Sequence, residues 1–217
     1  MDGVYLQNLM VYNKVLQQRN SLLKSMSSGQ NKEFALLDVL DSQLIAPANF
    51  IFSKRKVFTE TLLPMITEFY QKISGSKDAI SVQYESSLNS NSFEKILSGN
   101  RQKDIIMQRT MFGIHRDELC FNLDNGGFKS LASQGQKKSL LFALKLAEYQ
   151  CIKINKGFSP LLLLDDVFEK LDESRMANLL SWVCTENDGQ VFITDTHQKR
   201  LSAALEQLDI EWEIISL

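Results

Sequence analysis

Two adjacent carboxylates, Asp165 and Asp166, directly follow an apolar run that starts after Pro160 and contains four consecutive leucines at 161–164. Such a run predicts a strand buried on both faces, which is typical of parallel sheets in α/β proteins. Because ligands of these sheets bind at the carboxyl ends of the strands, we expect both acids to face a ligand. Mg²⁺ binds carboxylate oxygens together with substrate phosphates, so the predicted chemistry is metal-assisted handling of a phosphate. On this segment alone, a core strand followed by a solvated turn explains the pattern nearly as well.

A second candidate site lies upstream, at Ser133, Gln134, Gly135 and Gln136, where a helix is predicted to begin. The free N–H groups of a helix start, the positive end of its dipole and a serine hydroxyl together form an anion site. A glycine there lets the backbone approach a phosphate closely. Taken alone, Ser133 is more simply an N-cap, because serine is a common capping residue.

The elements that must position these two segments alternate along the second half of the chain. The apolar spacing predicts helices over 134–153, 173–186 and 198–207, and strands over 161–165, 190–194 and 210–216. Such alternation indicates βαβ units and a mostly parallel sheet.

The first half of the chain has a helical pattern. Apolar residues recur every three or four positions over 4–26 and over 33–74, which predicts long helices packed together as a helical arm. The longer stripe is most simply the seam of two or three long helices, and Pro47 and Pro64 are expected to kink or divide this region. Arg19 occupies a skipped position of the first apolar stripe, as Arg55 does in the second stripe.

Between the two halves, the period changes. Alternating residues predict a half-buried strand over 79–85 and another over 119–123, with short helices over 92–108 between them. The dipeptide at 125–126, Asn-Gly, predicts a hairpin whose partner strand starts near Phe128. The change of pattern places a boundary near 100–110, between a mainly helical arm domain with one or more short strands (1–105) and a C-terminal lobe (106–217).

The composition of the chain limits which classes of function are compatible with it. The chain has 217 residues, 44% of them hydrophobic and 23% charged, with a formal net charge of −2. Its bulk charge does not indicate a nucleic-acid binder, although a local basic face is compatible with these numbers. The three cysteines lack metal-type spacing, so we expect buried free thiols in a reducing cytosol. We expect no signal peptide and no stretch that is long and apolar enough to span a membrane.

Taken in order, the motifs resemble those of an ABC-type ATPase head: signature motif at 133–136, Walker B at 161–166, D-loop at 169–172 and switch histidine at 197. The resemblance implies that Asp165 anchors Mg²⁺ through its water shell and that Asp166 orients the attacking water. It also implies that Asp172 belongs to a loop at a subunit interface and that His197 senses the γ-phosphate. The segment 133–136 would then bind ATP, as part of the signature motif.

Further segments narrow the resemblance to the RecF family of bacterial recombination-repair ATPases, which are related to SMC heads: residues 113–119, 132–136, 144–148 and 163–168. Segments 5–9 and 16–24 are similar to the helical arm of that family. The implied fold is α/β, a helical arm domain followed by the Walker B and signature lobe of an ABC-type P-loop ATPase head with a mostly parallel sheet. The chain departs from the family at Ile114, where proline is usual, and in its D-loop, where 169–172 reads Glu-Lys-Leu-Asp. The second acid is aspartate, where transporters have glutamate, which fits slow hydrolysis and a switch.

By resemblance, the function is ATP-dependent DNA binding at single-strand/double-strand junctions and help in RecA loading. The implied partners and cofactors are RecR, RecO, ATP, Mg²⁺ and a second copy of the chain in an ATP-dependent homodimer. This places the chain in the cytoplasm, in DNA replication, repair, recombination and the SOS response. The alternative is a non-catalytic arm-plus-lobe adaptor that binds protein partners only.

One expected motif is absent. No Gly-x-x-x-x-Gly-Lys-Ser/Thr phosphate loop occurs in the sequence, whereas family members carry that loop near the N-terminus, before the arm. The chain is therefore predicted to be a C-terminal portion. ATPase activity is expected of the complete protein and not of these residues alone.

Overall fold

The computed structural model describes residues 2–27, 33–75, 78–124, 126–165, 170–195, 198–208 and 210–215. The chain forms two compact units. The arm unit consists of Met1–Glu60 and Tyr84–Cys120, and the lobe unit consists of Thr61–Gln83 and Phe121–Leu217. These units do not follow the single boundary predicted at residue 105, because one helix and two strands each continue from one unit into the other.

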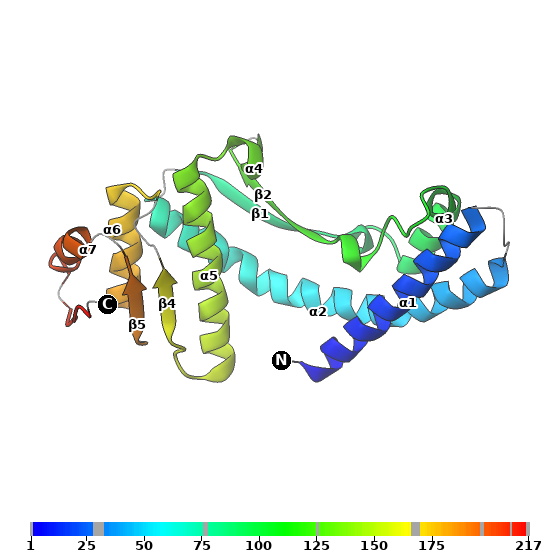
Figure 1. Cartoon of the computed structure of the whole chain (residues 1–217), viewed down its shortest axis with the longest axis horizontal. Helices are drawn as coiled ribbons and strands as arrows, with labels where there is room; N and C mark the ends of the chain where they lie inside the picture. Colours follow the sequence, from blue (N-terminus) through cyan, green and yellow to red (C-terminus); the bar gives the residue numbers. More distant parts are fainter. Residues whose placement is uncertain are drawn as a thin grey trace. The chain divides into compact units, whose positions relative to one another are not determined.

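Helices dominate the arm unit (Figure 1): α1 (Gly3–Ser27), the first part of α2 (Phe34–Ser74), the 3-10 helix η1 (Ser87–Asn89), α3 (Phe93–Ile106) and the 3-10 helix η2 (Ile114–Arg116). Their apolar stripes meet in a common core, as the spacing predicts. Its fully buried members include Tyr12, Leu23, Leu37, Leu44, Ile51 and Phe93.

Helix α2 is one helix of 41 residues and is not divided at Pro47 or Pro64. The predicted division of this region was wrong, and the predicted kink stays a prediction. A proline inside a helix removes a hydrogen bond and costs about 3 kcal/mol or more. The apolar stripe of α2 offsets that cost, since Ala48 and Ile51 in the turn after Pro47, and Ile66 two residues after Pro64, are fully buried.

The apolar character of α2 also corrects the expectation about membrane spans. An 18-residue window of this helix has a mean hydropathy of 1.3, which is enough by length and composition to cross a membrane. Core helices of folded units pass the same test. Several residues of α2, among them Leu37 and Leu44, belong to the core of the arm unit.

Polar residues inside the arm hold its helices together. The side chain of Arg19 is fully buried and donates to Asp41 at 2.6 Å, to Asp104 at 2.8 Å and to Thr110 at 2.7 Å. The two acids come from α2 and α3, so one guanidinium on α1 binds three segments of the arm. The position that interrupts the apolar stripe is thus the centre of a buried ionic cluster, which we call the Arg19 cluster.

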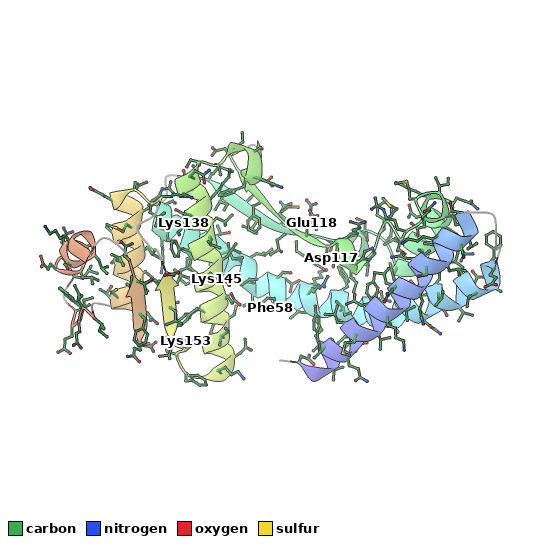
Figure 2. The ribbon with its side chains drawn as sticks, viewed as in Figure 1. Phe58, Asp117, Glu118, Lys138, Lys145 and Lys153 are labelled. Atoms are coloured by element: carbon green, nitrogen blue, oxygen red, sulfur yellow. The ribbon has the colours of Figure 1, made fainter. Side chains whose placement is uncertain are left out.

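The hydrogen bonds that residues 113–117 form with other segments of the described chain lie within the arm unit. Nε2 of His115 donates to the carbonyl of Thr110 at 3.1 Å, so Nδ1 is the atom that accepts from the Tyr12 hydroxyl, at 2.8 Å. Burial lowers the pKa of His115, which favours this neutral form. Asp117 (Figure 2) accepts from Arg55 at 2.9 Å and from the Tyr84 hydroxyl at 2.5 Å. These contacts join residues 113–117 to Tyr12 of α1, Arg55 of α2 and Tyr84.

The lobe unit follows the predicted alternation from residue 134 onward, as Figure 1 shows: α5 (Gln134–Lys156), β4 (Leu162–Asp165), α6 (Glu173–Ser181), the π-helix η3 (Trp182–Glu186), β5 (Val191–Thr194) and α7 (Gln198–Leu205). Strands β4 and β5 are parallel, with Leu162 opposite Val191 and Asp165 opposite Thr194. The core of the unit gathers residues of α2, α5, α6, β4 and η3, among them Tyr70, Leu146, Leu164, Leu179 and Val183.

A second sheet has the order β1 (Ile80–Glu85), β2 (Glu118–Leu123), β3 (Gly126–Gly127). Strands β2 and β3 pair antiparallel, which confirms the hairpin, although Asn125 itself lies outside the described residues. The partner strand is shorter than predicted. Phe128 begins the short helix α4 (Phe128–Leu131) and is buried in the lobe core, so it does not extend the ladder.

Two further expectations about the lobe were wrong. Residues 210–215 are not a strand. The leucine run 161–164, which leads into β4, is buried on one face only: Leu162 and Leu164 lie in the core, whereas Leu161 is 63% exposed and Leu163 is 71% exposed. Four consecutive leucines predict burial on both faces, but nothing in the described part of the chain covers the outer face.

Candidate functional site

The predicted site at 133–136 forms the start of α5. Ser133 is the N-cap: its hydroxyl accepts the N–H of Gln136 at 3.2 Å, and the side chain of Gln136 accepts the N–H of Ser133 at 2.8 Å. This reciprocal pair is a capping box. The capping interpretation of Ser133 is therefore confirmed, and its predicted contact with a nucleotide stays a prediction. The helix has 23 residues, so its N-terminus carries the full positive end of a helix dipole.

Gly135 brings this helix start against the loop before α6. A Cβ atom at Gly135 would lie 3.2 Å from the carbonyl oxygen of Lys170, which is tighter than most contacts of a real Cβ. The glycine thus permits a close approach between two backbone segments, as its small size allows. The predicted signature and D-loop segments are neighbours in the lobe unit.

Asp172 ends that loop as the N-cap of α6. Its carboxylate accepts the backbone N–H of Arg175 at 2.9 Å and forms an ion pair with the guanidinium of the same residue, with 3.2 Å between Oδ2 and Nε. The side chain of Asp172 is exposed. The N-termini of α5 and α6, which are capped by Ser133 and Asp172, therefore lie close together in the lobe unit.

Asp165 lies at the carboxyl end of β4, as predicted, and its side chain is exposed. The hydroxyl of Thr194, opposite Asp165 in the parallel register, donates to one oxygen of its carboxylate. Asp166 and His197 lie outside the described residues, so their roles stay predictions. Within the described ranges, no group of three or more His, Cys, Asp or Glu residues is placed to hold a metal ion.

No pattern of residues predicted the polar pair that lies beside residues 133–136, which we call the Ser133 turn. Arg175 donates to Asp78 at 2.7 Å, with 11% and 13% of the two side chains exposed. Asp78 also accepts from Gln136 at 3.0 Å and from the Tyr70 hydroxyl at 3.0 Å. Burial alone would raise the pKa of Asp78, but the hydrogen bonds from Arg175, Gln136 and Tyr70 outweigh it and lower that pKa below its usual value. Burial and the neighbouring Asp78 raise the pKa of Tyr70 to about 12.

Three lysines of α5 bear on whether the lobe unit has a local basic face. Lys138, Lys145 and Lys153 lie on this helix (Figure 2). Lys145 pairs with Glu148 at 2.9 Å, Lys153 pairs with Asp188, and the Lys138 ammonium lies 5.3 Å from the centre of the Phe142 ring. Lys145 and Lys153 are thus matched by acids, and the predicted contact with DNA stays a prediction.

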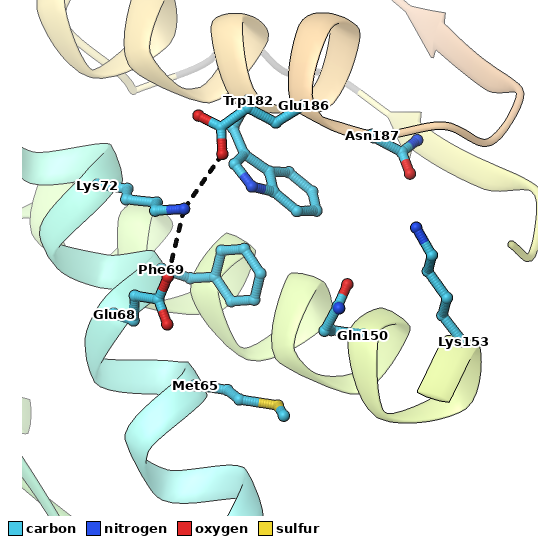
Figure 3. Close-up of a pocket in the computed structure, with 9 residues that line it drawn as sticks. All are labelled: Met65, Glu68, Phe69, Lys72, Gln150, Lys153, Trp182, Glu186 and Asn187. Carbon is cyan, nitrogen blue, oxygen red and sulfur yellow. Dashed lines mark hydrogen bonds and ion pairs between the residues drawn. The ribbon is translucent and has the colours of Figure 1, made fainter. Parts of the chain in front are cut away.

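A hollow of about 280 Å³ lies elsewhere in the lobe unit (Figure 3). Lys72 crosses one side of it, with its ammonium 3.3 Å from Glu68 and 3.2 Å from Glu186. The Phe69 and Trp182 rings meet edge to face, with centroids 4.7 Å apart. None of the residues predicted for the nucleotide site lines this hollow.

Comparison with known proteins gives one consistent result, although no protein-family model matches the chain. The DNA replication and repair protein RecF of Flavobacterium johnsoniae is 39% identical over 217 residues, which is 100% of this chain and 60% of that protein. RecF of Cytophaga hutchinsonii is 38% identical over 201 residues, which is 93% of this chain and 53% of that protein. The chain therefore spans between half and two thirds of the length of these relatives.

A solved structure has the same fold. The recombination mediator protein RecF with ATP, of the RecFOR pathway, superposes with a TM-score of 0.74 at 29% identity, over 91% of this chain and 54% of that one. The predicted fold class, a helical arm followed by a lobe with a parallel sheet, is confirmed by this match and by the β4–β5 pair.

Proposed function

This chain is a homologue of the DNA replication and repair proteins named RecF, and we propose that it forms the arm and the signature-bearing lobe of a RecF-type ATPase head. The complete ATPase binds DNA at single-strand/double-strand junctions and helps RecR and RecO to load RecA. It works in the cytoplasm as an ATP-dependent homodimer. The phosphate loop comes from the part of the family's proteins that this chain does not span.

The observation that carries the proposal is the packing of the Ser133 turn against the loop that ends at Asp172. Gly135 and Lys170 approach so closely that a Cβ on the glycine would lie 3.2 Å from the Lys170 carbonyl. In this proposal, the positive end of the α5 dipole faces the γ-phosphate of ATP bound to the other subunit. Asp172 lies beside it, where it meets the same subunit.

Asp165 is the proposed magnesium anchor. Its exposed carboxylate stands at the carboxyl end of a parallel strand and is oriented by the Thr194 hydroxyl. Mg²⁺ accepts few protein ligands and completes its shell with waters and substrate phosphates, so one carboxylate that binds through water fits this ion. The bound ion would neutralise charge on the phosphates. Asp166 would orient the attacking water and His197 would sense the γ-phosphate.

Exposed apolar side chains on the outer face of the β4–β5 sheet support the proposal that the complete head contains a further lobe. Leu161, Leu163 and Phe192 are 63%, 71% and 44% exposed. Clustered apolar side chains of this kind mark a surface that another polypeptide segment covers. In the complete head, we assign that role to the lobe that carries the phosphate loop.

The test is Ser133→Arg in a complete protein of this type. An arginine at the helix start adds bulk and a misplaced cation at the surface that we assign to the second subunit. We expect ATP binding by the monomer to stay nearly intact and ATP-dependent dimers to disappear, as measured by light scattering with and without ATP. Ser130→Arg is the matched control, because Ser130 is an exposed serine three residues upstream, and it should still dimerise.

Two outcomes would count against this proposal. Loss of ATP binding in the Ser133→Arg monomer would show that the motif acts on nucleotide bound to its own subunit. Unchanged dimerisation would show that the Ser133 turn lies outside the interface, which would favour the adaptor alternative.

A further inference from the structure

Arg175 binds three separate parts of the lobe unit with one guanidinium. Nη2 donates to Asp78 at 2.7 Å, Nη1 donates to the Ser139 hydroxyl at 3.0 Å, and Nε lies 3.2 Å from Asp172. Ser139 lies one turn into α5 and itself donates to the carbonyl of Gly135 at 2.9 Å. The planar fork of arginine suits such divergent contacts, which a single ammonium group cannot make at once.

Asp78 extends the contacts of Arg175 to the Ser133 turn. One oxygen of Asp78 accepts from Arg175 and the other accepts from the Gln136 amide at 3.0 Å. The carbonyl end of the same Gln136 side chain accepts the N–H of Ser133 at 2.8 Å. One ion pair and a series of hydrogen bonds therefore join Asp172 to Ser133 through Arg175, Asp78 and Gln136, and we call this series the Arg175 relay.

Burial makes the relay sensitive to the loss of any member. The Arg175 and Asp78 side chains are both nearly buried, where charge-assisted hydrogen bonds are strong and an unpaired charge is costly. Gln136 takes part with both ends of its amide, so its position is set from the Asp78 side and from the Ser133 side. The Tyr70 hydroxyl donates to the same Asp78 carboxylate from the end of α2.

We propose that Arg175 is a positioning residue that holds the Ser133 turn and the Asp172 loop in one fixed arrangement. A displacement of one segment is then transmitted to the other. This inference rests on the proposed function in one respect: that function makes the two linked segments the nucleotide-facing turn and the interface loop. In a complete head, nucleotide at the turn would thereby set the geometry of the interface loop.

Amide hydrogen exchange on this chain without nucleotide tests the relay directly. In Arg175→Met, we expect the Ser133 and Gln136 amides to exchange about tenfold faster, the factor that corresponds to the loss of one charge-assisted hydrogen bond. Arg175→Lys keeps the cation for Asp78, so exchange at Ser133 should stay close to the wild type. Lys145→Met, which removes an exposed ion pair on the same helix, is the control and should change neither amide.

A pH titration separates positioning from a general loss of structure. Asp78 has a lowered pKa, so the Gln136 bond to its carboxylate is present above that pKa and is lost as the pH falls through it. In Arg175→Met, the pKa of Asp78 should rise, and protection of Ser133 should then be lost at a higher pH than in the wild type. NMR titration of the Asp78 carboxyl measures the shift.

The outcomes are distinct. Unchanged exchange at Ser133 in a folded Arg175→Met variant would overturn the relay, whatever the function of the protein. Equally fast exchange throughout the lobe core in both Arg175 variants would also overturn it, because it would show a general structural role. If amide hydrogen exchange supports the relay, a second measurement follows. Arg175→Met in a complete protein should weaken ATP-dependent dimerisation about tenfold without weakening ATP binding by the monomer. Intact dimerisation there would overturn the transmission that we propose, and dimers that survive Ser133→Arg as well would overturn the proposed function.

Discussion

Replacement of Asp165 by alanine in a complete protein of this type is expected to abolish Mg²⁺-dependent ATP hydrolysis, a loss of at least about a hundredfold. Phosphoryl transfer depends on positioning and on neutralising the charge of the phosphates, and the metal supplies much of that charge. Alanine removes the carboxylate that stands opposite Thr194 at the end of β4. The rate of phosphate release at saturating ATP and Mg²⁺ measures the effect.

Two further variants serve as a control and a comparison for Asp165→Ala. Glu148→Ala removes an exposed carboxylate on α5 and should hydrolyse ATP at the wild-type rate. Asp166→Asn should bind ATP and dimerise but turn over slowly, because the residue is assigned to the attacking water. Equal rates in Asp166→Asn and wild type would contradict that role, and normal hydrolysis in Asp165→Ala would contradict the magnesium site.

The second large effect is expected in the arm unit. Arg19→Met should lower the free energy of unfolding of this chain by about 3–5 kcal/mol, because it leaves the buried Asp104 without its cation and leaves Asp41 with Arg101 alone. Asp104 is 1% exposed and Asp41 is 7% exposed, so water cannot replace the lost guanidinium without opening the core. Methionine keeps the length of the side chain, which limits the contribution of an empty cavity.

Urea denaturation followed by circular dichroism measures the change. The matched control is Lys54→Met, the same substitution at an exposed ion pair of the arm with Asp2, and it should leave the free energy unchanged within error. A further variant with Arg19, Asp41 and Asp104 all replaced by apolar residues should recover much of the loss. If Arg19→Met were as stable as the control, the cluster would not hold the arm together.

Much of the fold could be predicted, because local periodicity decides where helices and strands form. The start of α5 at Ser133, the end of β4 at Asp165 and the hairpin after β2 all followed from local residue types. Arg19 was visible as an interruption of an apolar stripe. Its partners were not, because Asp104 lies 85 residues away along the chain and nothing local specifies it.

The errors have physical causes. Pro47 and Pro64 are tolerated because burial of the α2 stripe outweighs the local penalty. The leucine run 161–164 predicted burial on both faces, but no described residue covers its outer face, where Leu161 and Leu163 are exposed. Asp78 and Arg175 are 97 residues apart, so the relay beside the candidate site could not be read from spacing. Asp166 and His197 were predicted from order along the chain alone.

A calorimetric titration with ATP and Mg²⁺ tests the central claim most directly, on this chain and on a complete protein that carries the phosphate loop. The helix N-terminus at Ser133 contributes about 0.3–1 kcal/mol to binding an exposed anion, whereas a micromolar complex needs about 8 kcal/mol. We therefore expect the 217 residues to bind ATP no more tightly than about millimolar, and the complete protein to bind far more tightly. A micromolar dissociation constant for this chain alone would contradict the account, because the nucleotide site would then not depend on a phosphate loop supplied from elsewhere.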